Sequence, residues 1–156
     1  MELQPEEAIR EAVAEAFAEH RRTIEALVPA AVIEHIGATS VPGSLTKGGL
    51  DLLVSVPAER FEQAAREMEE RYEIHQPEDW TETFASFKAP EGGIPIGVQL
   101  VVADSRDERL FIEWRELLVN EPDVLAEYNA LKRSQSGADP DSYVAAKGRF
   151  IEAHTT

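Results

Sequence analysis

One segment of the chain gathers most of the residue types that bind phosphate. Residues 35 to 56 read HIGATSVPGSLTKGGLDLLVSV, so small and hydroxylated residues follow a histidine and an isoleucine. Small residues allow a ligand to approach the backbone closely, and hydroxyl and amide groups donate hydrogen bonds to phosphate oxygens. The spacing GxxxxGK[ST] of a P-loop is absent. We predict a phosphate-binding turn, and its alternative is an ordinary strand-to-helix connection with a hydroxyl cap. The turn residues are Gly37, Ala38, Thr39 and Ser40.

The same segment supplies one cation and one carboxylate. Lys47 can balance phosphate charge, and Asp51 begins an otherwise apolar strand. A buried carboxylate is costly unless it is paired or binds a metal, so Asp51 is the predicted catalytic residue and magnesium ligand. Side chains two apart on a strand share a face, so a second metal-binding carboxylate would be expected at position 53. That residue is Leu53, which cannot bind a metal ion. A further metal ligand is expected from a neighbouring strand, where Gln99 offers an uncharged amide oxygen, and Glu34, Glu82 or Asp104 is the alternative. In the alternative, Asp51 only hydrogen-bonds the preceding turn.

The C-terminal part repeats a tyrosine and a lysine four residues apart. Tyr128 precedes Lys132, and Tyr143 precedes Lys147, so each pair shares one helix face. With Arg115 these residues are predicted to form a cationic wall opposite the turn, because Lys and Arg suit phosphate oxygens. In the alternative, the lysines are solvated on the helix surface and the tyrosines pack in the core.

The elements that must position these residues follow from the apolar pattern. Helical spacing predicts helices over 5–27, 57–71, 107–120, from 122 to a break at 136–140, and 141–154. Strands are predicted over 31–36, 50–56, 82–88 and 95–103, with a short one at 72–76. The turn at 89–93 indicates a hairpin, and a short helix is expected near 44–46. The pattern predicts one α+β domain over residues 1–156, with helices packed on a small sheet.

The amino-acid composition limits the kinds of ligand that we expect the protein to bind. The chain has 30 acidic and 15 basic residues, for a net charge of −15, which argues against general nucleic-acid binding. It has no cysteine, so disulfides and thiolate metal sites are excluded. We see no signal peptide and no apolar run long enough to cross a membrane, and expect a cytoplasmic protein. The expected partner is a small-molecule nucleotide or another phosphorylated ligand.

The run IEHIGATSVPGSLTKGGLDLLVSV, which ends at Val56, resembles the signature of the GrpB family. That signature has glycine, serine, threonine, a small residue, valine, proline and glycine, then a lysine and a strand with isoleucine and aspartate. Later segments are also similar: VQLVV, the Trp114–Arg115 helix, Pro122 to Lys132, and Tyr143 to Lys147. The resemblance covers most of the chain from about residue 28 onward.

The resemblance implies a nucleotidyltransferase-like fold, with a small mixed sheet and C-terminal helices that cover the cleft. It also implies transfer of a nucleotidyl group from a nucleoside triphosphate to a small acceptor, with magnesium as cofactor. Gly37 and Ala38 would take the glycine-serine positions, and Asp51 that of the first carboxylate. Leu53 and Gln99 favour as alternative a non-catalytic nucleotide- or coenzyme-binding module with a degraded metal site. In all, four residues depart from the pattern. They are Ala38 for serine, Gly48 for proline, Leu53 for the superfamily's second carboxylate and Gln99 for histidine.

Overall fold

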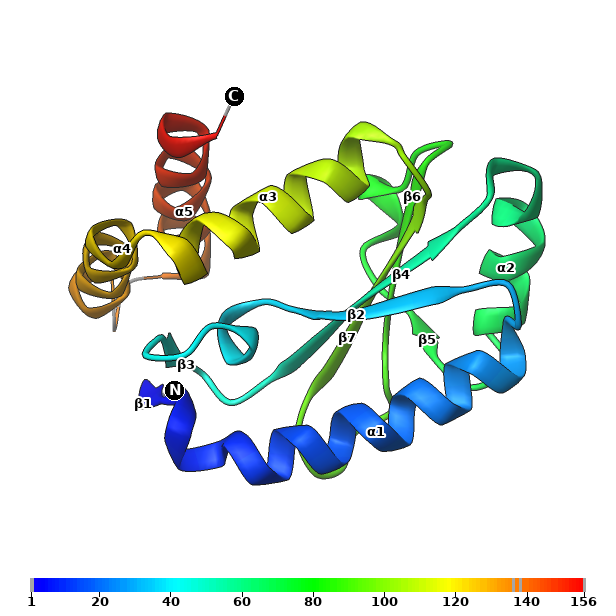
Figure 1. Ribbon diagram of the computed structural model, residues 1–156, viewed down its shortest axis with the longest axis horizontal. Helices are drawn as coiled ribbons and strands as arrows, with labels where there is room; N and C mark the ends of the chain where they lie inside the picture. The colour runs from blue at the N-terminus through cyan, green and yellow to red at the C-terminus, as the bar shows by residue number, and fades with distance from the viewer. Residues whose placement is uncertain (1, 136, 138, 156) are drawn as a thin grey trace.

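A five-stranded mixed sheet forms the centre of the computed structural model, which describes residues 2–135, 137 and 139–155 (Figure 1). The strands β4 and β7 are parallel, and the other neighbouring strands are antiparallel, including the predicted hairpin of β6 and β7. The α+β class with a small mixed sheet is confirmed. In spatial order the strands are β2 (Val32–Ile36), β4 (Leu50–Val56), β7 (Ile96–Val102), β6 (Phe84–Lys88) and β5 (Glu73–Ile74).

The two parallel strands lie inside the sheet, which explains their nearly continuous apolar sequence. Leu52, Leu53 and Val54 on β4 are all fully buried, so both faces of this strand are covered. Leu52 and Val54 belong to the larger core, and Leu53 belongs to a smaller apolar cluster on the opposite face. Asp51 and Gln99 lie on that second face with Leu53, because side chains alternate along a strand.

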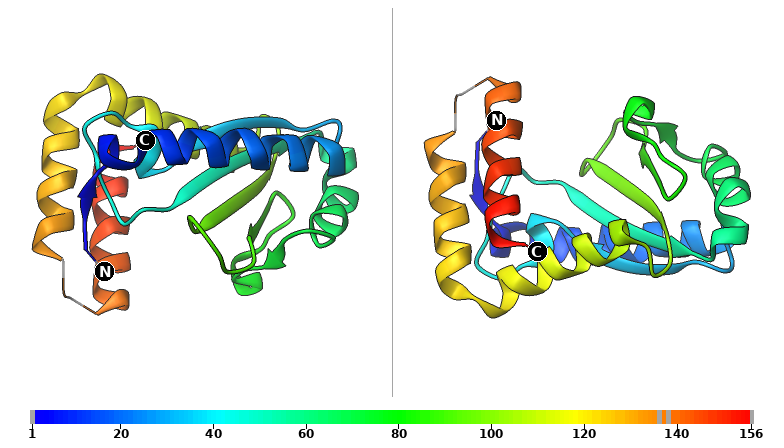
Figure 2. Two further views of the ribbon diagram at one scale, coloured as in Figure 1. Left: turned by 90° about the horizontal axis from the view of Figure 1, so that it is seen from below. Right: turned by 90° about the horizontal axis from the view of Figure 1, so that it is seen from above.

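Helices cover the two faces unequally. The larger core lies beneath α1 (Arg10–Leu27) and α2 (Phe61–Met68), whose side chains Ile24 and Met68 are fully buried in it. The other face is crossed by α3 (Arg106–Asn120). The last two helices, α4 (Pro122–Ser134) and α5 (Pro140–His154), stand side by side at one end of the sheet (Figure 2). This arrangement leaves a space bounded by one sheet face, α3 and the two C-terminal helices.

The expectation of a short helix near residues 44–46 is wrong. Leu45–Thr46 form a strand, β3, which pairs antiparallel with β1 (Gln4–Pro5). This partner lies some forty positions earlier in the chain, so local sequence does not reveal it. The helical turns of the described residues outside α1–α5 are 3-10 segments, and one of them follows Gly37. These segments are η1 (Glu6–Ile9), η2 (Ala38–Ser40), η3 (Ala58–Arg60) and η4 (Pro77–Asp79).

The predicted first helix is also shorter than expected, because Pro5 belongs to β1 and the regular α-helix begins at Arg10. Among the described residues, no helix combines the length and the apolar character that a bilayer crossing requires.

Candidate functional site

A cavity of about 700 Å³ lies between the second sheet face, α3 and the C-terminal helices. This volume is in the usual range of small-molecule sites. The structure brings most of the predicted site residues to its wall, although they come from distant parts of the chain. The predicted residues that line it are Gly37, Ala38, Lys47, Asp51, Gln99, Arg115, Lys132, Tyr143 and Lys147.

Asp51 lies on the cavity floor between two glycines. A Cβ atom added to Gly37 would lie 2.5 Å from Oδ2 of Asp51, and one added to Gly97 would lie 2.7 Å from Oδ1. Gly97 is the residue opposite Asp51 on β7. Gly37 also has a φ of 81°, which residues with a side chain rarely adopt. The carboxylate therefore occupies room that exists only because both neighbours are glycine.

No described residue gives the Asp51 carboxylate a hydrogen bond or an ion pair, so the bond to the preceding turn that we considered is not formed. Every fully buried side-chain oxygen or nitrogen in the described part has a hydrogen-bond partner, so the Asp51 oxygens must remain accessible from the cavity. Burial raises the pKa of Asp51, and the positive charge of Lys147 opposes this shift. An accessible carboxylate without a protein partner is typical of a binding site.

Lysine is concentrated at this cavity. The chain has four lysines, and three of them, Lys47, Lys132 and Lys147, line the cavity wall. Lys132 Nζ donates a 2.6 Å hydrogen bond to the carbonyl of Leu45 and lies 4.4 Å from the ring centre of Tyr128. These three residues are called the lysine cluster below.

A second tyrosine contacts the lysine cluster. Lys47 Nζ lies 4.3 Å from the ring centre of Tyr143, a cation–π distance. The two predicted Tyr–Lys pairs thus meet at one place, with Tyr143 of α5 against the loop lysine. Burial raises the pKa of Tyr143, and more strongly that of Tyr128.

The lysine cluster carries more positive charge than its surroundings neutralise. Burial lowers the pKa of Lys132 to about 8, and the charges of Lys147 and Lys47 add to this shift. Burial of its amine also lowers the pKa of Lys147, which the charge of Asp51 opposes and that of Lys47 reinforces, but the residue as a whole is exposed, so solvent screens these effects. An anionic ligand would relieve this repulsion.

The loop that carries Lys47 is fixed from both sides. The side chain of Asn129 on α4 accepts a hydrogen bond from the Leu45 amide at 3.0 Å and donates one to the Gly43 carbonyl at 3.1 Å. The buried carboxylate of Glu6 accepts a hydrogen bond from the Gly43 amide at 3.2 Å. Elements from both ends of the chain therefore position the loop lysine.

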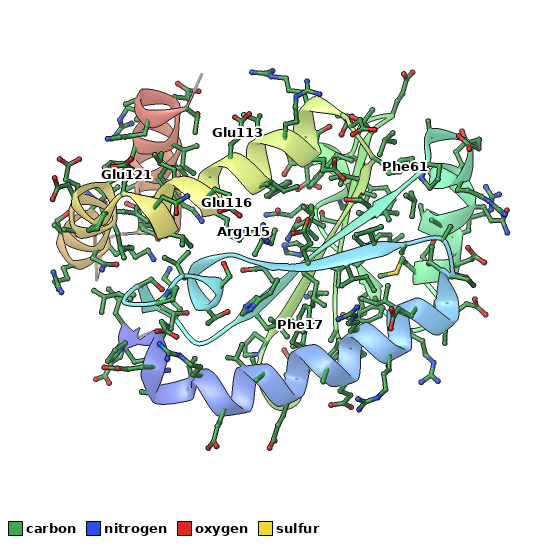
Figure 3. All side chains as sticks on the ribbon, viewed as in Figure 1. Phe17, Phe61, Glu113, Arg115, Glu116 and Glu121 are labelled. Carbon is green, nitrogen blue, oxygen red and sulfur yellow. The ribbon has the colours of Figure 1, made fainter. Side chains whose placement is uncertain are left out.

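Arg115 lines the cavity, but its charge is already paired. Its guanidinium donates hydrogen bonds of 3.0 Å to the carboxylate of Glu34 and to the carbonyl of His35, both on β2. It also pairs with Glu116 at 3.0 Å. Figure 3 shows Arg115 on the side of α3 that faces the sheet. Arg115 therefore joins α3 to β2. The remaining positive charges of the predicted cationic wall come from the lysine cluster.

The hydroxyls of Thr39 and Ser40 do not line the cavity. The Thr39 hydroxyl donates to the Gly49 carbonyl at 3.1 Å and bonds His35 Nε2 at 2.9 Å. The Ser40 hydroxyl donates to the Gly37 carbonyl at 2.6 Å. Both hydroxyls hold the turn in shape, so their predicted direct contact with phosphate is not supported by this geometry.

The predicted magnesium ligands do not form a metal site by themselves. In the described part of the chain, no group of three or more His, Asp or Glu side chains is placed to hold a metal ion. Asp51 lies opposite Gly97, and Gln99 lies two positions further along β7, opposite Leu53. Magnesium prefers a nearly octahedral set of oxygens. One carboxylate and one amide do not fit an ion held by the protein alone.

Sequence reasoning missed three features of the site. Phe84 on β6 and Phe111 on α3 stack with ring centres 6.2 Å apart and line the cavity. Gly97 makes room for Asp51, and an isolated glycine within a strand is a recognised sign of close approach. Asn129 fixes the loop, and nothing in its local sequence distinguishes it from a surface residue.

The comparisons with known proteins agree with this architecture. The family model described as "GrpB protein" matches residues 7–156. A UPF0157 protein of Vibrio cholerae is 31% identical over 143 residues, which cover 87% of this chain and 72% of that protein.

Two solved structures extend the likeness to the fold. The crystal structure of the conserved protein GrpB from Enterococcus faecalis has a TM-score of 0.68 at 23% identity, and covers 92% of this chain and 94% of that one. A structure of Cid1, described by its RNA terminal uridylyl transferase activity, has a TM-score of 0.59 at 14% identity. It covers 83% of this chain but only 40% of Cid1. At these identities the likeness shows a nucleotidyltransferase-like fold.

Proposed function

This chain belongs to the GrpB family, and we propose that its cavity binds the phosphate groups of a small molecule. Nucleotides are the class of ligand that the nucleotidyltransferase-like fold favours. A specific activity does not follow from fold, because one fold carries many functions. The proposal therefore depends on the residues of the cavity.

One observation carries the proposal: three of four lysines of a chain with a net charge of −15 converge on one cavity. Lys132 is buried whereas Lys47 and Lys147 are exposed, so the repulsion among these like charges acts most strongly on Lys132, and a counter-ion would relieve it. Asp51 supplies one negative charge beside the cluster and Asp107 another on the cavity wall, and Arg115 is already paired with Glu34. A di- or triphosphate carries the charge that the lysine cluster lacks, and ammonium groups suit phosphate oxygens.

Three separate segments of the chain supply the lysines of the cluster. Lys47 comes from the loop, Lys132 from α4 and Lys147 from α5, and all three line the cavity. The ligand's phosphates would lie between the loop and the two helices. In this position they are next to the cavity floor where Asp51 lies.

Nucleotidyl transfer to a small acceptor is the second candidate, and Asp51 is the observation that favours it. Its carboxylate faces the cavity without a protein partner and between two glycines. A carboxylate in this place would contact the reacting phosphate or the acceptor. Because the protein donors do not hold magnesium by themselves, this candidate requires the nucleotide to bring the ion.

The test is a ligand panel that separates binding from transfer. A ligand that binds only the folded state raises the melting temperature. We expect pyrophosphate, ADP and ATP to stabilise the protein in EDTA. Lys147→Met should reduce this effect, and Arg149→Met, on the same helix but outside the cavity lining, should not. Absence of stabilisation by all three ligands would refute the proposal. Release of pyrophosphate from ATP with magnesium and an acceptor would support the second candidate.

A further inference from the structure

The cavity has two chemically different ends. The lysine cluster lies at one end, where the loop meets α4 and α5. The other end, between β6 and the first half of α3, is lined by aromatic and aliphatic side chains. We call this second group the apolar end, and it consists of Phe84, Leu110 and Phe111.

The apolar end is incompletely filled by the protein. Leu110 lines the cavity but belongs to none of the three apolar clusters that the described residues form. Phe84 and Phe111 stack at 20° to each other over a cluster of only three buried residues, Ile36, Leu53 and Val101. Apolar surface that faces a cavity and has no apolar protein partner indicates a ligand with an apolar part.

Few polar side chains line this end of the cavity. Asp107 lines the cavity, and its carboxylate accepts a hydrogen bond from the hydroxyl of Thr83. Gln99 is the other polar side chain, at the floor beneath. The apolar end therefore recognises a ligand group by burial more than by hydrogen bonds.

We propose that the ligand is a phosphate or diphosphate ester whose other end is an apolar group, buried at the apolar end while the lysine cluster binds the phosphates. This inference rests on the proposed function and adds the chemical class of the ligand. A helix rises about 1.5 Å per residue, so Leu110 and Leu118 are roughly 12 Å apart along α3. Leu118 packs against Tyr128 beside the lysine cluster, so the two ends are separated by about this length.

A series of diphosphates tests the inference because charge stays constant while the apolar group grows. We would measure dissociation constants by calorimetry for inorganic pyrophosphate, dimethylallyl diphosphate and geranyl diphosphate, in EDTA. Each buried apolar group adds affinity in proportion to its area. We expect geranyl diphosphate to bind at least about tenfold more tightly than pyrophosphate.

Two substitutions in α3 test whether the apolar group of the diphosphate binds at the apolar end. Leu110→Ser should weaken geranyl diphosphate binding by about threefold to tenfold and leave pyrophosphate binding within about twofold. Val119→Ser is the matched control, because Val119 is also on α3, is 44% exposed and does not line the cavity. Leu110 lies outside the apolar clusters, so its replacement should leave the fold intact, which circular dichroism would check. If that variant unfolds, Phe111→Leu provides the same comparison.

The outcomes separate this inference from the proposed function. Equal affinities across the series, or an unchanged preference in both cavity variants, would overturn the inference while pyrophosphate binding stood. Failure of pyrophosphate itself to bind would refute the proposed function and the inference together.

Discussion

Asp51 and Gly97 face each other across the two parallel strands, and the carboxylate of one fills the space where the side chain of the other would be. A Cβ atom at position 97 would lie 2.7 Å from Asp51 Oδ1, closer than real Cβ contacts occur. The glycine therefore determines where the carboxylate of Asp51 can lie on the cavity floor.

Gly97→Ala should lower the free energy of unfolding by about 1 to 3 kcal/mol, because the new methyl group overpacks the site. In an Asp51→Ala background the same substitution should cost much less, since the clashing oxygen is gone. Chemical denaturation of the four proteins of this double-mutant cycle measures the coupling. Gly148→Ala is the control, because a Cβ there meets nothing within 4 Å, and alanine should stabilise α5 by about 0.5 to 1 kcal/mol. Additive effects at positions 51 and 97 would contradict the packing that we describe.

Asp51→Asn distinguishes the two candidate functions by the sign of its effect. If the cavity binds phosphates through the lysine cluster alone, removal of a nearby negative charge should raise pyrophosphate affinity in EDTA several-fold. If Asp51 contacts an ion brought by a nucleotide, the same substitution should weaken binding of magnesium-ATP. Calorimetry with and without magnesium measures both effects. A decrease in EDTA would show that the carboxylate contributes to anion binding in a way that we have not described.

Anion binding should take up protons at mildly alkaline pH. The pKa of Lys132 is lowered to about 8, so part of this side chain is neutral at pH 8.5 in the free protein. A bound phosphate favours the charged form and raises this pKa. Pyrophosphate affinity should therefore fall as pH rises through 8, and the binding enthalpy at pH 8.5 should vary with the ionisation enthalpy of the buffer. In Lys132→Met this dependence should largely disappear. A buffer-independent enthalpy in the wild-type protein would contradict the assignment.

We expect Glu6 to make the free energy of unfolding fall at acidic pH. Its pair with Arg10 and the Gly43 amide lower the pKa of the Glu6 carboxyl, so folding is favoured above the ordinary value of 4.5. This contribution is lost as pH falls through the lower pKa of the folded state. Glu6→Gln should flatten the decline of unfolding free energy below pH 4.5. Glu7→Gln, next to it but exposed, should keep the decline. Identical acid profiles for the two variants would contradict this role of Glu6.

The structural features that depend on local sequence patterns were predicted correctly. The apolar run from Leu50 to Val56 predicted an internal strand, and four-residue spacing predicted that Tyr128 and Lys132 share a helix face. The first was confirmed by the sheet order, and the second by their cation–π contact.

The features that the sequence did not reveal depend on partners that are remote in sequence or on hydrogen bonds within a single turn. Leu45 and Thr46 form a strand only because Gln4 and Pro5 lie alongside them. Ser40 turns its hydroxyl away from the cavity to bond Gly37, an alternative that the residue type always offers. The neutralisation of Arg115 by Glu34 joins residues 81 positions apart, which no local pattern encodes.

The most direct test of the central claim is calorimetric titration of pyrophosphate, in EDTA at pH 7 and low salt, into the wild-type protein and the double variant Lys47→Met, Lys147→Met. Low salt matters because screening weakens contacts between exposed charges. We predict one site in the wild-type protein and a loss of affinity of at least about tenfold in the double variant, which equals about 1.4 kcal/mol. No binding by the wild-type protein, or equal binding by the two proteins, would contradict the claim that the lysine cluster is a phosphate site.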